Sequence, residues 1–464
     1  MPREFFTEDT IAAIATPLGK GAIGVIKISG SEALPILKKL FKPAKSRSEF
    51  ESHKLYYGYI LHPGTNKVID EVLVAYMKAP KTYTREDVVE IYAHSGILIL
   101  KKIFEAVLLA GARAAKPGEF TLRAFLNGRI DLSQAEAIEE LVSAKTEEAL
   151  EIALKSLRGA LSKKVSELKE GLTECLMQVE TAIDFPEEDV EIMDPQGLRQ
   201  RLKQVLEVLE ELIKAHEEGR IYKEGISLVI AGRPNVGKSS LMNTLLREER
   251  AIVTPIPGTT RDFLEEEASI EGIPVRLIDT AGLRETQDEV EKIGVERARR
   301  KLKEADLVLL LFDCSEPPTR EDIRIYEEVK GYPHLTVLNK IDITPNELES
   351  WRKFLSDKGE AWVEVSVKEG RNLDLLTKRI VELILGGEKR DVPDVVPSLR
   401  QKAHLERASE RIRQALEELE KRQPFPELVA LEVRGALEEL SEILGEVSNE
   451  EILDRIFSRF CIGK

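Results

Sequence analysis

Residues 232–239 read Gly-Arg-Pro-Asn-Val-Gly-Lys-Ser, and this stretch decides the fold of the central part of the chain. It fits the pattern G-x-x-x-x-G-K-[ST], with a strand-like apolar run at 226–231 before it and a helix-like segment at 240–247 after it. Glycines let backbone N–H groups curl around phosphate oxygens, and the start of a helix adds partial positive charge. Lys238 then reaches the β- and γ-phosphates, and the Ser239 hydroxyl can coordinate Mg²⁺. The pattern predicts a nucleotide-binding loop between a buried strand and a helix.

A second motif, Asn339-Lys340-Ile341-Asp342, follows a later apolar run and indicates which base is bound. The Asp342 carboxylate can accept two hydrogen bonds from the ring N–H and the amino group of guanine, which adenine does not offer. The stem of Lys340 can cover the base. Ser366-Val367-Lys368 stands where GTPases usually carry Ser-Ala-Lys, and a backbone N–H makes that contact. The order of these motifs predicts GTP, not ATP.

A third motif, Asp279-Thr280-Ala281-Gly282, ends another apolar run and is typical of a switch that responds to the γ-phosphate. Asp279 can hold Mg²⁺ through water, and the Gly282 N–H can contact the γ-phosphate. Upstream, Thr259 or Thr260 can complete the Mg²⁺ shell. Leu283 follows the motif and cannot orient water as a glutamine would. Hydrolysis therefore needs another base and another positive charge; the alternative is a switch that binds GTP without hydrolysing it.

The composition of the 464 residues excludes several classes of protein. Hydrophobic residues make up 42% and charged residues 33% of the chain, a balance that excludes a disordered protein. No apolar run approaches the ~20 residues that span a bilayer. The three cysteines, Cys175, Cys314 and Cys461, are far apart and suit a reducing, cytoplasmic location. The net charge of −15 argues against a stand-alone nucleic-acid binder, because basic residues supply that affinity.

The pattern of apolar, charged and turn-forming residues changes along the chain and predicts four segments. Residues 1–127 mix short strand-like runs with turns, and residues 128–218 read as long amphipathic helices. Apolar strands alternate with helices over 219–388, which indicates a mostly parallel α/β sheet. The expected strands there are 226–231, 263–270, 274–279, 307–312, 335–339 and 361–366. The residue pattern over 389–464 again predicts helices, and the segment 404–422 has one apolar face. The predicted architecture is one helical domain with an α/β domain inserted.

These motifs, with Cys461-Ile462-Gly463-Lys464 at the C-terminus, resemble those of the MnmE (TrmE) family of tRNA-modification GTPases over essentially the whole chain. The matching runs include Gly-Thr-Thr-Arg-Asp from 258, Asp-Thr-Ala-Gly-Leu-Arg from 279, Arg-Ala-Phe-Leu-Asn from 123 and Ala-Ile-Asp-Phe-Pro-Glu-Glu from 182. The resemblance implies a multidomain α/β and all-α fold, with a Ras-like P-loop GTPase domain inserted in a helical domain. An α+β tetrahydrofolate-binding domain, which also builds a homodimer, would precede them.

The resemblance further implies that potassium occupies the space of an arginine finger, which offsets charge developing in phosphoryl transfer. Its ligands would be Asn235, Thr254, Ile256 and Thr259, whereas Ser239 and Thr260 would hold Mg²⁺. Glu291 would position the attacking water. The residues expected to contact GTP are Asn235, Val236, Gly237, Lys238, Ser239, Ser240, Thr254, Pro255, Ile256, Pro257, Gly258, Thr259, Thr260, Asp279, Thr280, Ala281, Gly282, Asn339, Lys340, Ile341 and Asp342.

For the N-terminal domain, the resemblance implies a site for 5-formyl- or 5,10-methylene-tetrahydrofolate formed by Lys27, Glu90, Arg129 and Lys464. A glutamate suits the amino and ring N–H donors of the pterin, and cations suit its acidic tail. Cys461 is the candidate for a direct role in one-carbon chemistry.

Three positions depart from the usual pattern of the family. Lys27 stands where an arginine is often found, so the bidentate fork of a guanidinium is lost. Arg85 and Ser95 replace glycines in the usual Tyr-Thr-Gly-Glu-Asp and His-Gly-Gly runs.

The resemblance implies an enzyme that acts with an MnmG-like partner in a heterotetramer or larger complex, FAD being bound only by the partner. Together they would add a carboxymethylaminomethyl or aminomethyl group at C5 of the wobble uridine of certain tRNAs, with glycine or ammonium supplying nitrogen. Hydrolysis of GTP to GDP would drive domain motion. The alternative is a GTP-gated ribosome or RNA assembly switch without modification chemistry. A membrane-remodelling GTPase would need an apolar or polybasic membrane segment, which the sequence lacks.

Overall fold

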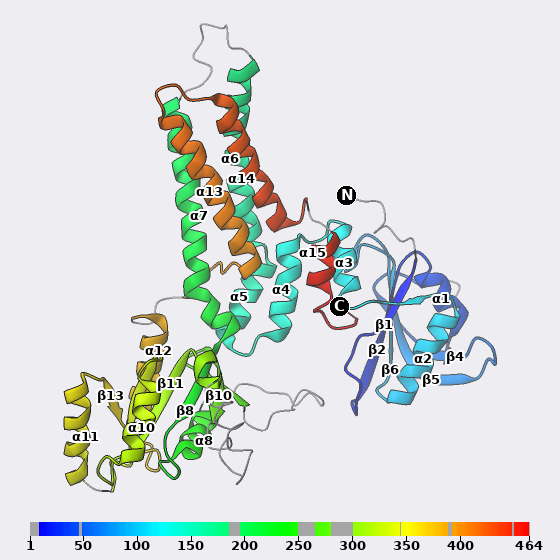
Figure 1. Cartoon of the computed structure of the whole chain (residues 1–464). Coiled ribbons are helices and arrows are strands. Elements are labelled where there is room, and N and C mark those ends of the chain that lie inside the picture. Colours follow the sequence, from blue (N-terminus) through cyan, green and yellow to red (C-terminus); the bar gives the residue numbers. More distant parts are fainter. Residues whose placement is uncertain are drawn as a thin grey trace. The chain divides into compact units, whose positions relative to one another are not determined.

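The chain divides into two compact units in the computed structural model (Figure 1). The described residues are 9–45, 49–184, 195–248, 265–279, 300–343, 345–387, 392–447 and 450–463. The first unit contains Met1–Glu139, Ser156–Leu209 and Ala403–Lys464, and the second contains Glu140–Lys155 and Glu210–Lys402. Each unit therefore combines segments that are distant in the sequence.

A seven-stranded sheet with the order β3-β4-β5-β6-β2-β1-β7 forms the N-terminal part of the first unit (Figure 1). Its strands are β1 (Ile11–Ile14), β2 (Ile23–Ser29), β3 (Phe41–Pro43), β4 (Lys54–Leu61), β5 (Val68–Met77), β6 (Val88–His94) and β7 (Arg113–Ala114). Neighbouring strands are antiparallel, except for β1 and β7. Helices α1 (Ala33–Leu40) and α2 (Ile97–Leu109) cover one face, where Ile36 and Leu100 join the core that contains Ile26.

The opposite face of this sheet carries a mostly apolar row of side chains and is open over part of its area. Tyr57 of β4, Leu73 of β5, Tyr92 of β6 and Val25 of β2 are register partners and form one row across four strands. Tyr57 and Leu73 remain 47% and 42% exposed. Near β1, the ring of Phe120 packs on the sheet and is fully buried. This face is therefore covered by Phe120 near β1, whereas its apolar side chains on β4 and β5 remain exposed.

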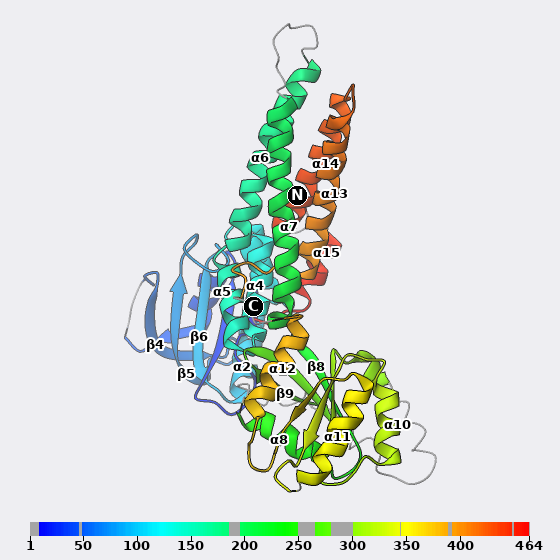
Figure 2. The ribbon, with the colours of Figure 1, turned by 90° about the vertical axis from the view of Figure 1, so that its left-hand side faces the viewer.

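Helices make up the rest of the first unit, and four of them (α4, α5, α7 and α13) continue into the second unit. The helices are α3 (Glu119–Leu126), α4 (Leu132–Ser143), α5 (Glu147–Leu157), α6 (Ala160–Asp184), α7 (Pro195–Glu224), α13 (Leu399–Glu420), α14 (Pro426–Leu444) and α15 (Glu450–Phe457). Helix α6 packs along α14, and Figure 2 shows the axes of α6, α13 and α14 lying roughly along one another, with α13 and α14 antiparallel. The predicted apolar face within 404–422 is confirmed, since Leu405, Ala408 and Ile412 are fully buried.

A six-stranded sheet with the order β13-β12-β11-β8-β10-β9 forms the centre of the second unit. Its strands are β8 (Ile226–Ala231), β9 (Glu265–Ile270), β10 (Ile273–Asp279), β11 (Leu307–Asp313), β12 (His334–Asn339) and β13 (Trp362–Glu364). All pairings are parallel except that of β9 with β10, which form a hairpin. The strand expected at 361–366 is shorter than predicted, because the chain turns after Val365 and Ser366 makes only an isolated bridge to Arg371.

Helices cover both faces of this sheet, as a parallel sheet with buried strands requires. Helices α8 (Lys238–Glu248) and α12 (Leu373–Leu385) lie on one face, and α10 (Arg320–Val329) and α11 (Pro345–Lys358) lie on the other. The predicted α/β architecture is therefore confirmed. Within the described part of the chain, no helix has an apolar stretch long enough to cross a bilayer.

The direction of the strands decides where the functional motifs meet. The chain leaves β8 into the phosphate loop at Gly232, and it leaves β12 into the Asn339–Asp342 motif. Because β8, β11 and β12 are parallel, these two motifs emerge at the same edge of the sheet. Ligands of open α/β sheets bind outside the carboxyl ends of the strands. We therefore expect a nucleotide site at this edge of the sheet.

A buried charge network holds α3 to the N-terminal sheet. The guanidinium of Arg123 on α3 is 7% exposed, and it lies 2.7 Å from Asp9, 3.1 Å from Glu86 and 3.2 Å from Glu119. Arg113 pairs with Asp9 and Glu119 at 2.6 Å each. Removing one member of such a network leaves a buried charge without its partner.

We therefore expect Arg123→Ala to lower the free energy of opening of this region by about 3–5 kcal/mol. Hydrogen exchange of the β2 and β6 amides measures that free energy locally. The matched control is Lys163→Ala, because Lys163 is 81% exposed and its carboxylate partner is 3.9 Å away. Its effect should stay within about 0.5 kcal/mol. Equal protection of β2 and β6 in wild type and Arg123→Ala would show that the network contributes little.

Candidate functional site

The loop 232–237 joins β8 to α8 and turns sharply at three positions. The φ angles are +150° at Gly232, +65° at Asn235 and +105° at Gly237, which favour residues that tolerate the left-handed region. A Cβ on Gly237 would lie 2.4 Å from Nδ2 of Asn339, so a side chain does not fit there. Successive turns of this kind let backbone N–H groups converge on an anion.

Lys238 starts α8 and is almost completely buried in this loop, with 6% of its surface exposed. Its ammonium donates to the carbonyl oxygens of Gly232 at 3.0 Å and Arg233 at 2.9 Å. The positive charge therefore lies inside the curve of the loop, where phosphate oxygens would bind. Ser239 and Ser240 follow in the first helical turn and are exposed, and the Ser239 hydroxyl is the kind of oxygen ligand that Mg²⁺ prefers.

The side chain of Asn339 connects the phosphate loop to two other loops. It is 3% exposed, and its Nδ2 donates to the carbonyl oxygen of Val236 at 2.8 Å. Its Oδ1 accepts a hydrogen bond from the Val367 N–H at 3.1 Å. Asn339 therefore fixes the phosphate loop and the Ser366-Val367-Lys368 segment relative to the end of β12.

The base-recognition residues that follow Asn339 are held by neighbouring side chains. Ser366 is fully buried and donates through Oγ to Asp342 at 2.6 Å, which lowers the pKa of that carboxyl below its ordinary value. The Lys340 ammonium lies 2.6 Å from the carboxylate of Asp313. Burial opposes ionisation of Asp313, but the hydrogen bonds from Lys340 and Ser315 keep its pKa below the usual range. An ionised, fixed Asp342 is what recognition of guanine N–H groups requires.

Several predicted contacts lie outside the described residues. They are Thr254, Pro255, Ile256, Pro257, Gly258, Thr259, Thr260, Thr280, Ala281, Gly282 and the predicted catalytic Glu291. The backbone of Asp279 ends β10 beside Ile230 of β8, which leads into the phosphate loop. Asn235 is exposed on that loop. The structure thus brings together the predicted residues of the phosphate loop, of the base-recognition motif and the end of β10.

A second group of predicted residues meets on the far face of the N-terminal sheet. Lys27 of β2 and Glu90 of β6 are register partners, and the Tyr92 hydroxyl donates to Glu90 at 2.5 Å. The Lys27 ammonium lies 4.5 Å from the centroid of the Tyr83 ring, and the Arg129 guanidinium lies 4.7 Å from the same centroid. We call Lys27, Tyr83, Glu90, Tyr92 and Arg129 the sheet-face cluster.

The cluster carries more positive than negative charge. Burial lowers the pKa of Lys27, the carboxylate of Glu90 opposes this shift, and the nearby Arg129 adds to it. Lys27 also lies 5.0 Å from the centroid of the Phe120 ring. Two cations, one carboxylate and aromatic rings are a donor and acceptor set that suits a flat, polar, acidic ligand.

The C-terminal segment reaches the same domain. Helix α15 packs on α3, where the rings of Phe457 and Phe125 are 6.4 Å apart. A Cβ on Gly463 would lie 2.8 Å from the Cα of Ala15, which follows β1. Cys461 is exposed, and Lys464 lies outside the described residues. Gly463 of the C-terminal motif therefore lies beside the end of β1. Ala15 is two residues after Ala13, and Ala13 is the register partner of Lys27.

Two of the three departures from the usual family pattern, Arg85 and Ser95, have local structural partners. Arg85 has a φ of +59°, and its Nη1 donates to the carbonyl oxygen of Asn127 at 2.8 Å. Ser95 is 9% exposed and its Oγ contacts the carbonyl oxygen of Gly19 at 3.5 Å. Neither side chain blocks the pairing of Lys27 with Glu90.

Sequence reasoning missed the two tyrosines of the sheet-face cluster and the neighbouring ring of Phe120. Tyr83 belongs to the loop before β6, Tyr92 to β6 itself and Phe120 to α3, so no local spacing links them. The alternation of β6 was a usable signal for Tyr92, because residues two apart on a strand share a face with Glu90. Nothing comparable pointed to Tyr83 or Phe120.

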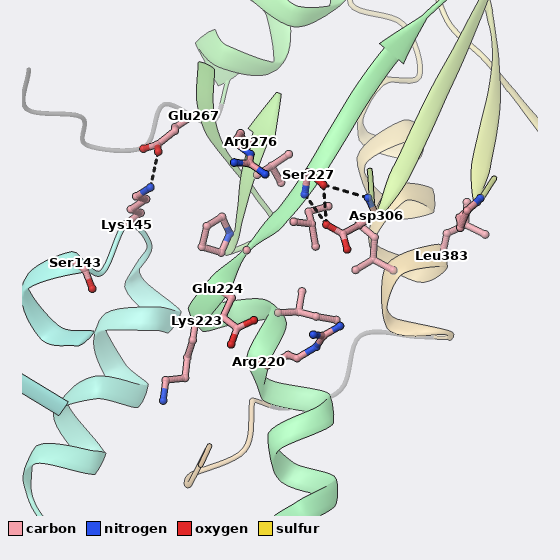
Figure 3. Close-up of a pocket in the computed structure, with 17 residues that line it drawn as sticks. Ser143, Lys145, Arg220, Lys223, Glu224, Ser227, Glu267, Arg276, Asp306 and Leu383 are labelled. Atoms are coloured by element: carbon pink, nitrogen blue, oxygen red, sulfur yellow. Dashed lines mark hydrogen bonds and ion pairs between the residues drawn. The ribbon is translucent and has the colours of Figure 1, made fainter. Parts of the chain in front are cut away.

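A cavity of about 730 Å³ opens at the other, amino-terminal edge of the six-stranded sheet (Figure 3). There the Ser227 N–H and hydroxyl donate to the carboxylate of Asp306 at 2.8 and 2.9 Å. Lys145 pairs with Glu267 at 2.5 Å across the same cavity wall (Figure 3). Since the nucleotide motifs lie at the carboxyl edge, this cavity lies away from the predicted nucleotide site.

Comparison with known proteins gives two family matches and many full-length relatives. The family described as GTP-binding protein TrmE N-terminus matches residues 10–129, and the family described as MnmE helical domain matches residues 132–461. The chain is 46% identical over 456 residues to the tRNA modification GTPase MnmE of Aquifex aeolicus (strain VF5), covering 98% of this chain and 100% of that one. It is 48% identical over 460 residues to the same protein of Syntrophus aciditrophicus (strain SB), with 98% and 100% covered.

Two solved GTPase structures are also similar to parts of the chain. One is an Era variant from Aquifex aeolicus bound to GDP·AlF4−, which is 29% identical, with 43% of this chain and 69% of that chain covered and a TM-score of 0.29. The other is the G domain of the T. maritima FeoB iron transporter, which is 27% identical, with 34% and 98% covered and a TM-score of 0.26.

The relatives match this chain over nearly their whole length and share its N-terminal, helical and nucleotide-binding parts. This match favours a GTPase of tRNA modification over an assembly switch without modification chemistry. The chain belongs to the MnmE family of tRNA modification GTPases and is a P-loop enzyme that hydrolyses GTP.

Proposed function

We propose that the chain is a potassium-dependent GTPase, activated by dimerisation, that acts with an FAD-dependent MnmG-like partner in the cytoplasm. Together they add a carboxymethylaminomethyl or aminomethyl group at C5 of the wobble uridine of certain tRNAs. A 5-formyl- or 5,10-methylene-tetrahydrofolate bound by the N-terminal domain donates the carbon. The close approach of Gly463 to Ala15 carries the folate part of this proposal, because it supports a joint site of the C-terminal motif and the sheet-face cluster.

The residues of the sheet-face cluster fit a folate. The Glu90 carboxylate can accept hydrogen bonds from the amino and ring N–H groups of a pterin, and the ring of Tyr83 offers a flat apolar contact. Lys27 and Arg129 supply cations for the acidic tail. Cys461 is exposed, as a thiol that takes part in one-carbon chemistry must be. Lys464 follows the contact of Gly463 with the sheet and would add a further cation.

The phosphate loop fits magnesium and potassium as well as GTP. Ser239 supplies a hydroxyl oxygen for Mg²⁺, with Thr260 completing the shell. Asn235 is exposed on the loop and supplies one oxygen for potassium, with Thr254, Ile256 and Thr259 as the others. A cation there would stabilise the charge that develops between the β- and γ-phosphates. Glu291 would position the attacking water, since Leu283 cannot.

The open part of the N-terminal sheet supports a homodimer. Leu55, Tyr57 and Leu73 are 61%, 47% and 42% exposed, and the last two are register partners on neighbouring strands. A contiguous apolar face of this kind is typical of a surface that another copy covers. The net charge of −15 suits a complex in which the partner protein binds most of the tRNA.

The guanine-recognition role of Asp342 can be tested by changing the base. In Asp342→Asn the carboxylate that accepts both guanine N–H groups is lost, so GTP affinity should fall roughly 10- to 150-fold. Xanthosine triphosphate presents a carbonyl in place of the amino group and should bind more tightly to this variant than to wild type. Fluorescence titration with labelled nucleotides measures both. Asp357→Asn, at an exposed position of α11, is the matched control and should leave both affinities unchanged.

The proposed potassium site can be tested by changing the salt. Replacing potassium with sodium at constant ionic strength should lower the rate of GTP hydrolysis roughly tenfold or more. The smaller sodium ion would be held less well by oxygens spaced for potassium, which leaves less positive charge beside the transferring phosphoryl group. GTP affinity should change little. In Asn235→Ala the difference between the two salts should largely disappear. Equal turnover of the wild-type protein in potassium and sodium would remove the potassium mechanism.

The proposed folate site can be tested by thermal unfolding of the full-length protein. 5-Formyltetrahydrofolate at about 100 times its dissociation constant should stabilise the protein by about 2.7 kcal/mol and raise the melting temperature. Glu90→Gln should lose most of this shift, since the amide presents an N–H donor to the pterin donors. Glu105→Gln, exposed on α2, should keep it. An unmoved wild-type melting curve contradicts the folate assignment.

A further inference from the structure

Arg85 has a backbone conformation that favours glycine. Its φ of +59° lies in the left-handed region, where the Cβ of an L-residue is crowded. A strained residue of this kind persists only when its surroundings hold it, and it points to a function of the side chain.

The side chain of Arg85 is held at the turn that follows α3. Its Nη1 donates to the carbonyl oxygen of Asn127 at 2.8 Å, and Nδ2 of Asn127 donates back to the carbonyl oxygen of Thr84 at 2.6 Å. A Cβ on Gly128 would lie 3.5 Å from the same Nη1. The guanidinium is therefore fixed beside Gly128, the residue before Arg129 of the sheet-face cluster.

The acidic neighbours of Arg85 are hydrogen-bonded to other groups. Glu86 accepts hydrogen bonds from the Ser29 hydroxyl at 2.7 Å and from Arg123 at 3.1 Å. Asp87 accepts hydrogen bonds from the Tyr76 hydroxyl at 3.0 Å and from the Ala79 N–H at 2.8 Å. Among the described residues, Arg85 donates only to the Asn127 carbonyl, and its side chain is exposed. It keeps four N–H donors and its full charge for a ligand.

We propose that Arg85 binds the γ-linked glutamates of a polyglutamylated folate and so gives the site a preference for the longer tails. This proposal rests on the folate site proposed above. Each added γ-linked glutamate brings one more α-carboxylate, and a guanidinium fork matches a carboxylate in shape and charge. The tail would leave the pterin at Glu90, pass the Lys27 and Arg129 cations at Tyr83, and reach Arg85 at the surface.

The variant that tests this role is also the one that the backbone favours. Arg85→Gly removes the guanidinium and relieves the left-handed strain, so the protein should fold normally. Arg85→Lys keeps the charge but not the fork. Lys67→Ala is the matched control, because it removes one exposed positive charge from the turn between β4 and β5.

The experiment measures the dissociation constants of 5-formyltetrahydrofolate with one and with five glutamates, using calorimetry on the full-length protein. Wild type and Lys67→Ala should bind the pentaglutamate roughly three- to fivefold more tightly, a preference that falls as salt is raised. In Arg85→Gly the two constants should become nearly equal, with the monoglutamate constant unchanged. Arg85→Lys should retain only part of the preference.

Three results would overturn the proposal. An equal preference in wild type and Arg85→Gly, with both folates bound, removes the role of Arg85 but leaves the folate site in place. A loss of tRNA affinity in Arg85→Gly without any change in the folate ratio assigns the guanidinium to a nucleic-acid phosphate instead. Failure of wild type to bind either folate removes the folate site and this proposal together.

Discussion

One buried side-chain amide holds the nucleotide-binding unit together at its functional edge. Asn339 donates to the carbonyl oxygen of Val236 and accepts from the Val367 N–H, so two backbone groups from different loops are satisfied by one side chain. Leaving either group buried without a partner would cost about 1–3 kcal/mol. An aspartate would place negative charge against the Val236 carbonyl, and a leucine would satisfy neither group. Because the phosphate loop and the predicted base-recognition loop share this amide, their positions relative to each other are fixed.

The N-terminal domain uses arginines in two opposite ways. Arg123 is buried and pairs with Asp9, Glu86 and Glu119, so the negative charge of these three acids is compensated within the domain. Arg85 and Arg129 are exposed and have no such compensation from the carboxylate of Glu86. A chain with a net charge of −15 can therefore present a locally positive surface to an acidic ligand.

Local patterns predicted the nucleotide-binding fold well, because each signal depends on residues adjacent in sequence. Strand β8, the loop after it and α8 follow from one run of residues, and the strands expected at 263–270 and 274–279 correspond to β9 and β10. The end of β13 was not predictable, since the bridge of Ser366 to Arg371 depends on the turn that brings Ser366 to Asp342. The sheet-face cluster was predicted only in its charged members.

The aromatic part of that cluster depends on tertiary packing. The ring of Tyr83 meets Lys27 and Arg129 from elements that are separated by many residues in the chain. The approach of Gly463 to Ala15 likewise joins the two ends of the sequence. Neither contact produces a periodic pattern in the sequence, because these residues come together only in the folded chain.

Helix α5 links the two units by its own backbone, because the boundary between them falls at Lys155 and Ser156. Within the second unit, Ile152 of α5 is buried in the same core as Ile270 and Ile273 of the β9–β10 hairpin. At the tip of that hairpin, a Cβ on Gly272 would lie 2.1 Å from the carboxyl carbon of Glu148, so α5 and the hairpin are in direct contact. The ion pair of Lys145 with Glu267 adds a second attachment. Strand β10 ends at Asp279, the predicted start of the γ-phosphate switch, so the strand that carries the switch and the helix that leaves the unit form one packed body.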